Sequence, residues 1–119
     1  MPSRQKHRGM GPDDPILFSE DMLPKLRRAV EDFSLLLTKG YSENASLKLV
    51  GDHLRLTQRQ RMAVLRASCS DEAKHRRQSK RISPKEVARQ SLAIDGYNLL
   101  ISIEAALSGG IILDCRDGY

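Results

Sequence analysis

Aromatic residues, cysteines and long apolar runs are all scarce in this chain of 119 residues. It has no Trp, its Phe and Tyr residues make up 4% of the sequence, and it has two Cys. The longest run without a charged residue, 105–113, is far shorter than the roughly 20 residues that span a bilayer. The basic N-terminal residues precede no apolar stretch of the signal-peptide type. We therefore expect no membrane association, a cytoplasmic location and an aliphatic core.

The cysteines and histidines lack the spacing of a metal site. Cys69 and Cys115 form no Cys-x-x-Cys motif, and His7, His53 and His75 have no ligand-like spacing with them or with one another. This pattern predicts two free thiols in a reducing compartment and argues against a structural zinc site.

Positive charge is concentrated in the middle of the chain, although the net charge is only +5. Residues 51–90 carry eleven Lys and Arg against four Asp and Glu, whereas residues 91–119 carry one against four. A basic surface attracts polyanions and supplies the non-specific part of nucleic-acid affinity. RNA or another nucleic acid is therefore the expected partner, and a merely solvated basic surface is the alternative.

The pattern of Gly, Pro and helix caps divides the chain into three parts. Residues 1–15 mix Gly and Pro with charges and are predicted to be a mobile basic arm. Residues 16–90 are predicted to be a basic helical domain, and residues 91–119 the start of a second domain. Apart from a single turn near Ser19, helices are expected from about Pro24 to Thr38, after a Ser42 cap to about His53, from Gln58 to about Cys69, and after Ser70 and Ser83.

Residues 50–57 resemble the turn of a helix-turn-helix motif. Gly51 supplies the small residue at the helix contact, and Thr57 opens the next helix with a Thr-x-x-Gln capping box. Two residues depart from the motif. Arg55 stands where the turn usually has Gly, and Arg61 stands where an apolar residue is usually buried.

The candidate nucleic-acid-binding residues lie just before the third predicted helix, on that helix and on the basic stretch after it. Guanidinium groups there can make bidentate contacts with phosphates, and no aromatic residue is present to stack on bases. Phosphate tracking or recognition of duplex shape therefore fits better than base reading of single strands. A solvent-facing arginine row is the alternative. The candidates are Arg55, Arg59, Arg66, Lys74, Arg76, Arg77, Lys80 and Arg81.

The last part of the chain has a strand–helix–strand pattern. The apolar runs 92–94 and 111–113 are typical of buried strands, and residues 97–107 have helical spacing between them. Such a βαβ unit joins parallel strands, and two parallel strands do not make a stable sheet alone. The predicted fold class is therefore mainly α, with a helix-turn-helix-like domain followed by an incomplete α/β fragment. We expect the chain to be cut off inside this second domain.

Residues 92–100, Leu-Ala-Ile-Asp-Gly-Tyr-Asn-Leu-Leu, resemble the first strand and following loop of PIN and NYN-like ribonucleases. The resemblance implies that Asp95 binds a metal ion, expected to be Mg²⁺, and that Asp95 and Asn98 are catalytic. Mg²⁺ favours carboxylate oxygens, and ligands of open α/β sheets bind beyond the strand ends. Glu104, Asp114 and Asp117 are further candidates only by proximity. We favour a solvent-facing Glu104 and a turn-forming Asp117.

The chain from residue 17 to residue 118 also resembles the prokaryotic domain-of-unknown-function family four-three-four. The residues that carry this resemblance are 49–52, 56–61, 69–72, 94–98 and 104–110. The family implies a helical domain followed by a PIN-like domain, of which residues 91–119 are only the opening.

We therefore expect an RNA-binding helical module attached to the start of a metal-dependent ribonuclease domain and not catalytic by itself. The alternatives are a helix-turn-helix DNA-binding regulator and a protein-interaction module that docks or self-associates through its incomplete sheet.

Overall fold

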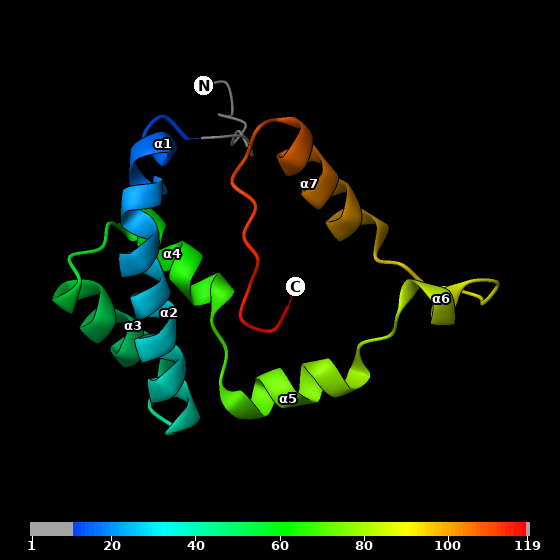
Figure 1. The fold of residues 1–119 in the computed structure, drawn as a ribbon, viewed down its shortest axis with the longest axis horizontal. Helices are drawn as coiled ribbons and strands as arrows, with labels where there is room; N and C mark the ends of the chain where they lie inside the picture. The colour runs from blue at the N-terminus through cyan, green and yellow to red at the C-terminus, as the bar shows by residue number, and fades with distance from the viewer. Residues whose placement is uncertain (1–10, 119) are drawn as a thin grey trace, which may run out of the picture. The chain divides into compact units, whose positions relative to one another are not determined.

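The computed structural model describes residues 11–118 and shows helices joined by turns and loops, with a non-helical segment after the last helix (Figure 1). Most of the predicted arm, residues 1–10, lies outside the described residues, and the arm's last two residues belong to a short helix. The elements are α1 (Asp14–Leu17), a 3-10 turn η1 (Glu20–Met22), α2 (Leu23–Thr38), α3 (Glu43–His53), α4 (Gln58–Ala67), α5 (Asp71–Lys80), α6 (Pro84–Val87) and α7 (Gly96–Leu107). Of the described helices, none is long and apolar enough to cross a membrane.

The described residues form two compact units. The bundle unit comprises residues 16–81 and 113–118 and contains α2, α3, α4 and α5. The α7 unit comprises residues 11–15 and 82–112 and contains α6 and α7.

Side-chain caps begin the helices where the sequence predicts them. The backbone N–H of Gln60 donates to Thr57 Oγ1 at 3.2 Å, and the N–H of Thr57 donates to Gln60 Oε1 at 3.0 Å. This reciprocal pair is the predicted capping box of α4. Ser42, Ser70 and Ser83 likewise accept hydrogen bonds from the third residue of α3, α5 and α6.

Three helices end with the same left-handed turn. Gly40 after α2 and Gly109 after α7 have φ of 91° and 73°, which glycine adopts without steric cost. Arg55 takes this position after α3 with φ of 54°. The next residue, Leu56, donates its N–H to Gly51 O at 2.8 Å and closes the turn. Arginine therefore adopts the conformation of the usual turn glycine, at a cost of roughly 1–2 kcal/mol.

The core of the bundle unit lies where α2 packs on α3 and α4. Phe33 and Ala29 of α2 are fully buried, and Val64 of α4 is 1% exposed. Gln60 is also buried, and its amide Nε2 donates to Leu17 O at 2.9 Å. Because its amide is hydrogen-bonded, this polar side chain can occupy the core. The other buried apolar residues of the core cluster are Leu26, Val50, Leu54 and Leu56.

The predicted helix of the α7 unit is confirmed, but the predicted strands are not. Residues 92–94 and 111–113 belong to no strand, and residues 11–118 contain none at all. A strand needs a hydrogen-bonded neighbour, and here neither run is paired with another segment. Leu92 and Ile94 are each 59% exposed, so the apolar run does not form a buried strand either. The βαβ fragment predicted for residues 91–119 is therefore not seen.

Candidate nucleic-acid interface

The side chain of Arg61 in α4 lies against Gly51 in α3 and links the two helices. Its Nε donates to Leu56 O at 3.0 Å, and its Nη2 donates to Asp52 Oδ1 at 2.9 Å. A Cβ atom on Gly51 would lie 2.5 Å from Arg61 Nε, so only glycine leaves room for the guanidinium. Arg61 stands where the helix-turn-helix pattern usually buries an apolar residue, and its hydrogen bonds satisfy the guanidinium there. The neighbouring apolar residue, Met62, does not take its place in the core, since it is 37% exposed.

The three candidate arginines around α4 all have exposed side chains. Arg55 lies in the turn before the helix, Arg59 in its first turn and Arg66 in its last turn. Arg59 and Arg66 are seven residues apart, which places them on the same side of an α-helix. Arg59 and Arg66 are therefore exposed on one side of α4, and a role for them in nucleic-acid binding stays a prediction.

Helix α5 is a polar helix without buried residues. The N–H of Asp71 donates to Thr38 Oγ1 at 2.9 Å, which attaches the start of α5 to the end of α2. Asp71 and Glu72 occupy its first turn, where the helix dipole favours negative charge. The basic residues follow. Arg76, Arg77, Lys80 and Arg81 are exposed, and Lys74 is half-buried.

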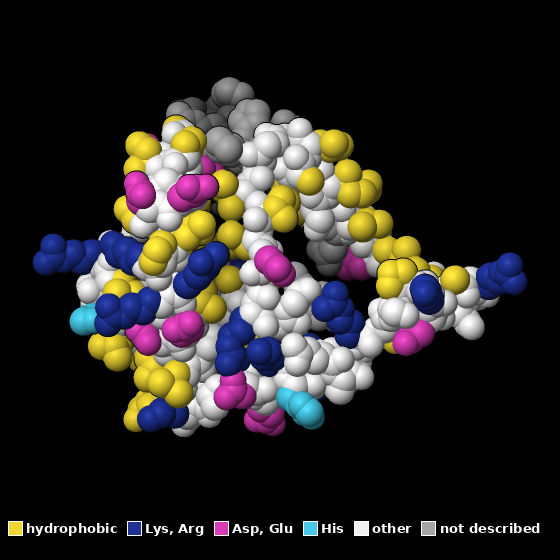
Figure 2. All heavy atoms as spheres, viewed as in Figure 1, with side chains coloured by type: hydrophobic (Ala, Val, Ile, Leu, Met, Phe, Trp, Pro, Cys, Tyr) yellow, Lys and Arg dark blue, Asp and Glu magenta, His cyan; other side chains and the backbone are white. Residues whose placement is uncertain are grey.

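Residues 113–118, here named the C-terminal strap, lie against the junction between α4 and α5. The backbone N–H of Arg116 donates to Ala67 O at 2.9 Å, and its Nη1 donates to Cys69 O at 2.8 Å. Its Nη2 also forms an ion pair with the carboxylate of Asp71. Lys and Arg side chains lie where the strap runs beside α5 in Figure 2. Arg116 therefore anchors the strap on two helices.

The next two residues of the strap contact the basic side chains of α5. Asp117 Oδ2 accepts a hydrogen bond from Arg77 Nη1 at 2.8 Å, and the Asp117 side chain is only 13% exposed. Gly118 has φ of 86°, and a Cβ on it would lie 2.9 Å from Arg81 Nη1. Its N–H donates to Cys115 O at 2.9 Å, which confirms the predicted turn at Asp117 and Gly118.

The electrostatics of the strap follow from these contacts. Burial raises the pKa of the Cys115 thiol, and the nearby Asp117 and Asp114 carboxylates raise it further. The hydrogen bond to Asp71 raises the pKa of the Arg116 guanidinium. Cys69 is buried and is not joined to Cys115, so both thiols are free as predicted.

The residues predicted to bind a metal do not form a metal site among those that the structure describes. Asp95 is exposed and lies directly before α7. Asn98 lies in the first turn of α7, and its side chain is outside the described residues. Glu104 is exposed, as expected. Within the described part, no three His, Cys, Asp or Glu side chains gather to hold a metal ion. A hard cation such as Mg²⁺ needs several oxygen ligands, so these residues alone do not fit it.

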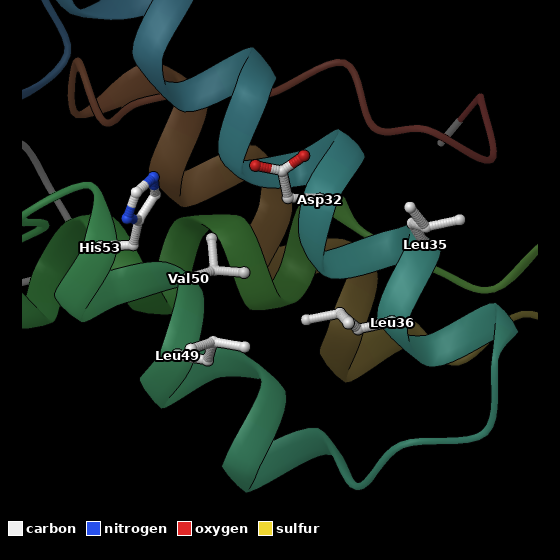
Figure 3. A pocket seen from close by; sticks show the side chains of 6 residues that line it. All are labelled: Asp32, Leu35, Leu36, Leu49, Val50 and His53. Carbon is white, nitrogen blue, oxygen red and sulfur yellow. The ribbon is translucent and has the colours of Figure 1, made fainter.

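A groove of ≈ 330 Å³ lies between α2 and α3 and is lined mainly by aliphatic side chains (Figure 3). Leu35 and Leu49 are 54% and 61% exposed. Asp32 lies at the edge of the groove and pairs with Arg28 within α2, with Nε and Oδ2 3.7 Å apart. His53 is the other polar residue that lines the groove, and the remaining lining residues are Leu and Val.

The sequence did not predict two sets of contacts near the candidate interface. The first is the set of hydrogen bonds from Arg61 to Leu56 and Asp52, and the second is the set of strap contacts made by Arg116 and Asp117. The ion pairs of the strap join residues 45 and 40 positions apart. No local spacing signals such pairs. The only sequence signal for the strap contacts is opposite charge. Arg116 stands between Asp114 and Asp117, and α5 carries both acidic and basic residues.

Fold and surface together define a mainly helical protein whose fifth helix is polar and carries mostly basic side chains. Residues 25–80 match the sequence profile of a family described as protein of unknown function (DUF434), and residues 84–119 match that of a domain of unknown function (DUF5616).

A curated relative, the uncharacterized protein MJ0935 of Methanocaldococcus jannaschii, is 33% identical over 92 residues. The match covers 77% of this chain and 44% of the relative, so the chain spans less than half of that protein's length. No solved structure matches the chain at a significant level. These matches support a family of unknown function, as the resemblance to family four-three-four predicts, and none of them is to a PIN or NYN-like ribonuclease.

Proposed function

We propose that the bundle unit binds nucleic acid, with RNA favoured, through the basic side chains of α4 and α5. The observation that supports this proposal most directly is the exposure of those side chains on α4, which packs in the core, and on α5, which a hydrogen bond from Asp71 attaches to α2. Arg59 and Arg66 lie on one side of α4, and α5 adds Arg76 and Lys80 without burying any residue. A helix with no buried residue contributes little to the core, which is consistent with a role at the surface.

Phosphate groups are the part of the nucleic acid that this surface suits. Guanidinium groups form bidentate contacts with phosphates, and ammonium groups add point charges. Residues 54–96 include no Phe, Tyr or Trp, so stacking on unpaired bases is disfavoured. Binding through phosphates and duplex shape suits double-stranded RNA, whose deep major groove hides its base edges.

Cleavage of the bound RNA is a separate proposal that rests on the resemblance of residues 92–100 to PIN and NYN-like ribonucleases. In it, Asp95 and Asn98 are this chain's contribution to a Mg²⁺ site of a longer protein. One carboxylate and one amide supply too few oxygen ligands, so the chain alone is expected to bind RNA without cutting it.

Fluorescence anisotropy with labelled duplex RNA, duplex DNA and single-stranded RNA at several salt concentrations tests the binding proposal. The key variant replaces Lys74, Arg76 and Lys80 by Gln. Its matched control replaces Arg27, Lys39 and Lys48, three exposed residues elsewhere in the bundle unit.

We expect the α5 variant to bind RNA more weakly and to flatten the salt dependence. The slope of log K against log salt should fall by about 0.7–0.9 for each phosphate that the variant no longer neutralises. Equal behaviour of the two triple variants would show that α5 is not the interface. A gel of the recovered RNA, with and without Mg²⁺, tests cleavage in the same samples.

A second candidate function is the binding of duplex DNA through the helix-turn-helix-like pair. The observation that favours it is the short turn between α3 and α4, closed by Gly51 and Arg61, with Arg59 exposed in the first turn of the second helix. In this case Arg59→Gln should reduce DNA affinity more than RNA affinity, and duplex DNA should bind more tightly than duplex RNA.

A further inference from the structure

The C-terminal strap supplies negative charge to the same helix that the proposed function assigns to nucleic acid. Asp117 accepts a hydrogen bond from Arg77 at 2.8 Å, in the way that a phosphate oxygen would. The carboxylate is 13% exposed, whereas the Arg77 side chain is 46% exposed, so Asp117 is held in place while Arg77 remains accessible from one side. Gly118 lies against the guanidinium of Arg81.

We propose that the C-terminal strap is an autoinhibitory segment that covers Arg77 and Arg81, so that nucleic acid must displace it to use the whole basic face of α5. The inference rests on the proposed function and adds to it a competition within the chain. A carboxylate and a phosphate cannot occupy the same side of one guanidinium. The chain without its strap contacts should therefore bind polyanions more tightly than the intact chain.

The strap has separate parts for anchoring and for covering. The backbone and side chain of Arg116 bind the carbonyl oxygens of Ala67 and Cys69, and its guanidinium pairs with Asp71. None of these partners is a basic residue of the candidate interface. Asp117, the next residue, makes the contact with Arg77. Loss of the Arg116 contacts should therefore release Asp117 from Arg77 without altering any basic side chain of α5.

Arg116→Gln gives the sharpest test, because two explanations predict opposite signs. The substitution removes one positive charge, so electrostatics alone predicts weaker binding to duplex RNA. Release of the strap predicts tighter binding, by about threefold, the amount expected for an exposed ion pair with added hydrogen bonds. Arg27→Gln, in exposed surface of α2, removes the same charge and should only weaken binding.

A second pair of variants keeps the test valid if Arg116→Gln disturbs folding. Asp117→Asn and Asp114→Asn each remove one negative charge from the strap. Asp117 pairs with Arg77, whereas Asp114 forms no ion pair with any other described residue. Asp117→Asn should raise RNA affinity more than Asp114→Asn does. Equal increases would mean that only net charge matters and would overturn the inference.

The thiol of Cys115 reports strap position without any activity measurement. Cys115 is partly buried, and burial and the nearby carboxylates raise its pKa, so it should react slowly with a thiol reagent while the strap is docked. Arg116→Gln should speed labelling several-fold, and so should saturating duplex RNA. Cys115→Ser identifies the signal, because it leaves only Cys69 to react and so measures the labelling of that thiol by itself.

The outcomes separate the inference from the function on which it rests. If neither the intact chain nor any strap variant binds RNA or DNA, the proposed function fails and the inference fails with it. If the intact chain binds and Arg116→Gln only weakens binding, as Arg27→Gln does, the function stands and the autoinhibition is overturned. Tighter binding by Arg116→Gln together with faster Cys115 labelling supports both.

Discussion

The two units of this protein contain similar apolar residues, but only the bundle unit buries them in a core. In the bundle unit Phe33 is fully buried, whereas Leu107 of the α7 unit is 84% exposed. The larger apolar side chains of residues 82–112 that remain exposed also include Ile82, Leu92, Ile94, Tyr97, Leu99, Leu100, Ile103 and Ile112. The comparison teaches that hydrophobic content does not make a core unless several elements present their apolar faces to one another.

The reason for this difference is the number of helices that can pack. In the bundle unit, short turns hold α3 and α4 against the long helix α2, so apolar faces meet. In the α7 unit, α7 has twelve residues and α6 has four. A helix of about twelve residues is marginal without tertiary packing. Exposed apolar surface of this kind marks interaction sites, and docking or self-association through residues 91–119 stays a prediction.

Truncation of one apolar side chain in each unit should give the largest contrast. Phe33→Ala should lower the free energy of unfolding by about 3–5 kcal/mol, because it leaves a cavity in a packed core. Leu107→Ala should change it by less than about 0.5 kcal/mol. Urea unfolding followed by circular dichroism measures both. A large loss for Leu107→Ala would show that the α7 unit has a core of its own in solution.

Replacing a helical glycine by alanine should have different effects on stability in the two units. Gly51→Ala should cost about 1–2 kcal/mol, because the new Cβ displaces Arg61 from its hydrogen bonds. In an Arg61→Ala background, the same change should stabilise by about 0.5–1 kcal/mol, as alanine replaces a helical glycine. Gly96→Ala is the matched control, since apart from its chain neighbours and its own helix backbone no described atom lies within 4 Å of the added Cβ. Additive effects at Gly51 and Arg61 would contradict the contact.

Removal of the same kind of helix cap should matter in one unit only. Thr57→Ala breaks the capping box of α4 and should cost about 1 kcal/mol. Ser83→Ala removes the cap of α6, which has no buried residue, and should leave the main unfolding transition unchanged. Thermal unfolding of both variants tests this contrast. Equal shifts in Tm would indicate that α6 unfolds together with the bundle unit.

The smallest expected effect concerns pH and the strap. The pKa of Cys115 is raised in the folded chain, so the thiol contributes stability at pH values below its unfolded pKa. This contribution is lost as the pH rises through the higher folded pKa. Strap docking should therefore be independent of pH near neutrality and should weaken slightly in alkali. Absorbance titration of the thiolate, with Cys115→Ser as the reference, measures the shift, and a pKa below the ordinary value would contradict it.

Helix boundaries were predictable because their signals are local. Thr57 and Gln60 are three residues apart, and Gly40 follows α2 directly, so a short window contains the chemistry that starts or stops each helix. The candidate arginines of α4 were placed on one side of their helix by the same periodicity. The strand prediction at 92–94 was wrong because an apolar run of this length does not say whether a partner strand is present.

The contacts that distinguish this surface depend on residues far apart in the chain. Arg61 over Gly51 joins two helices, and Arg116 and Asp117 reach back to α4 and α5 across at least 40 positions. Composition had shown a basic middle and an acidic end, and periodicity had shown which residues share a helix face. That the acidic end lies on the basic helix followed from packing alone, because charge pairs at such separation leave no spacing pattern in the sequence.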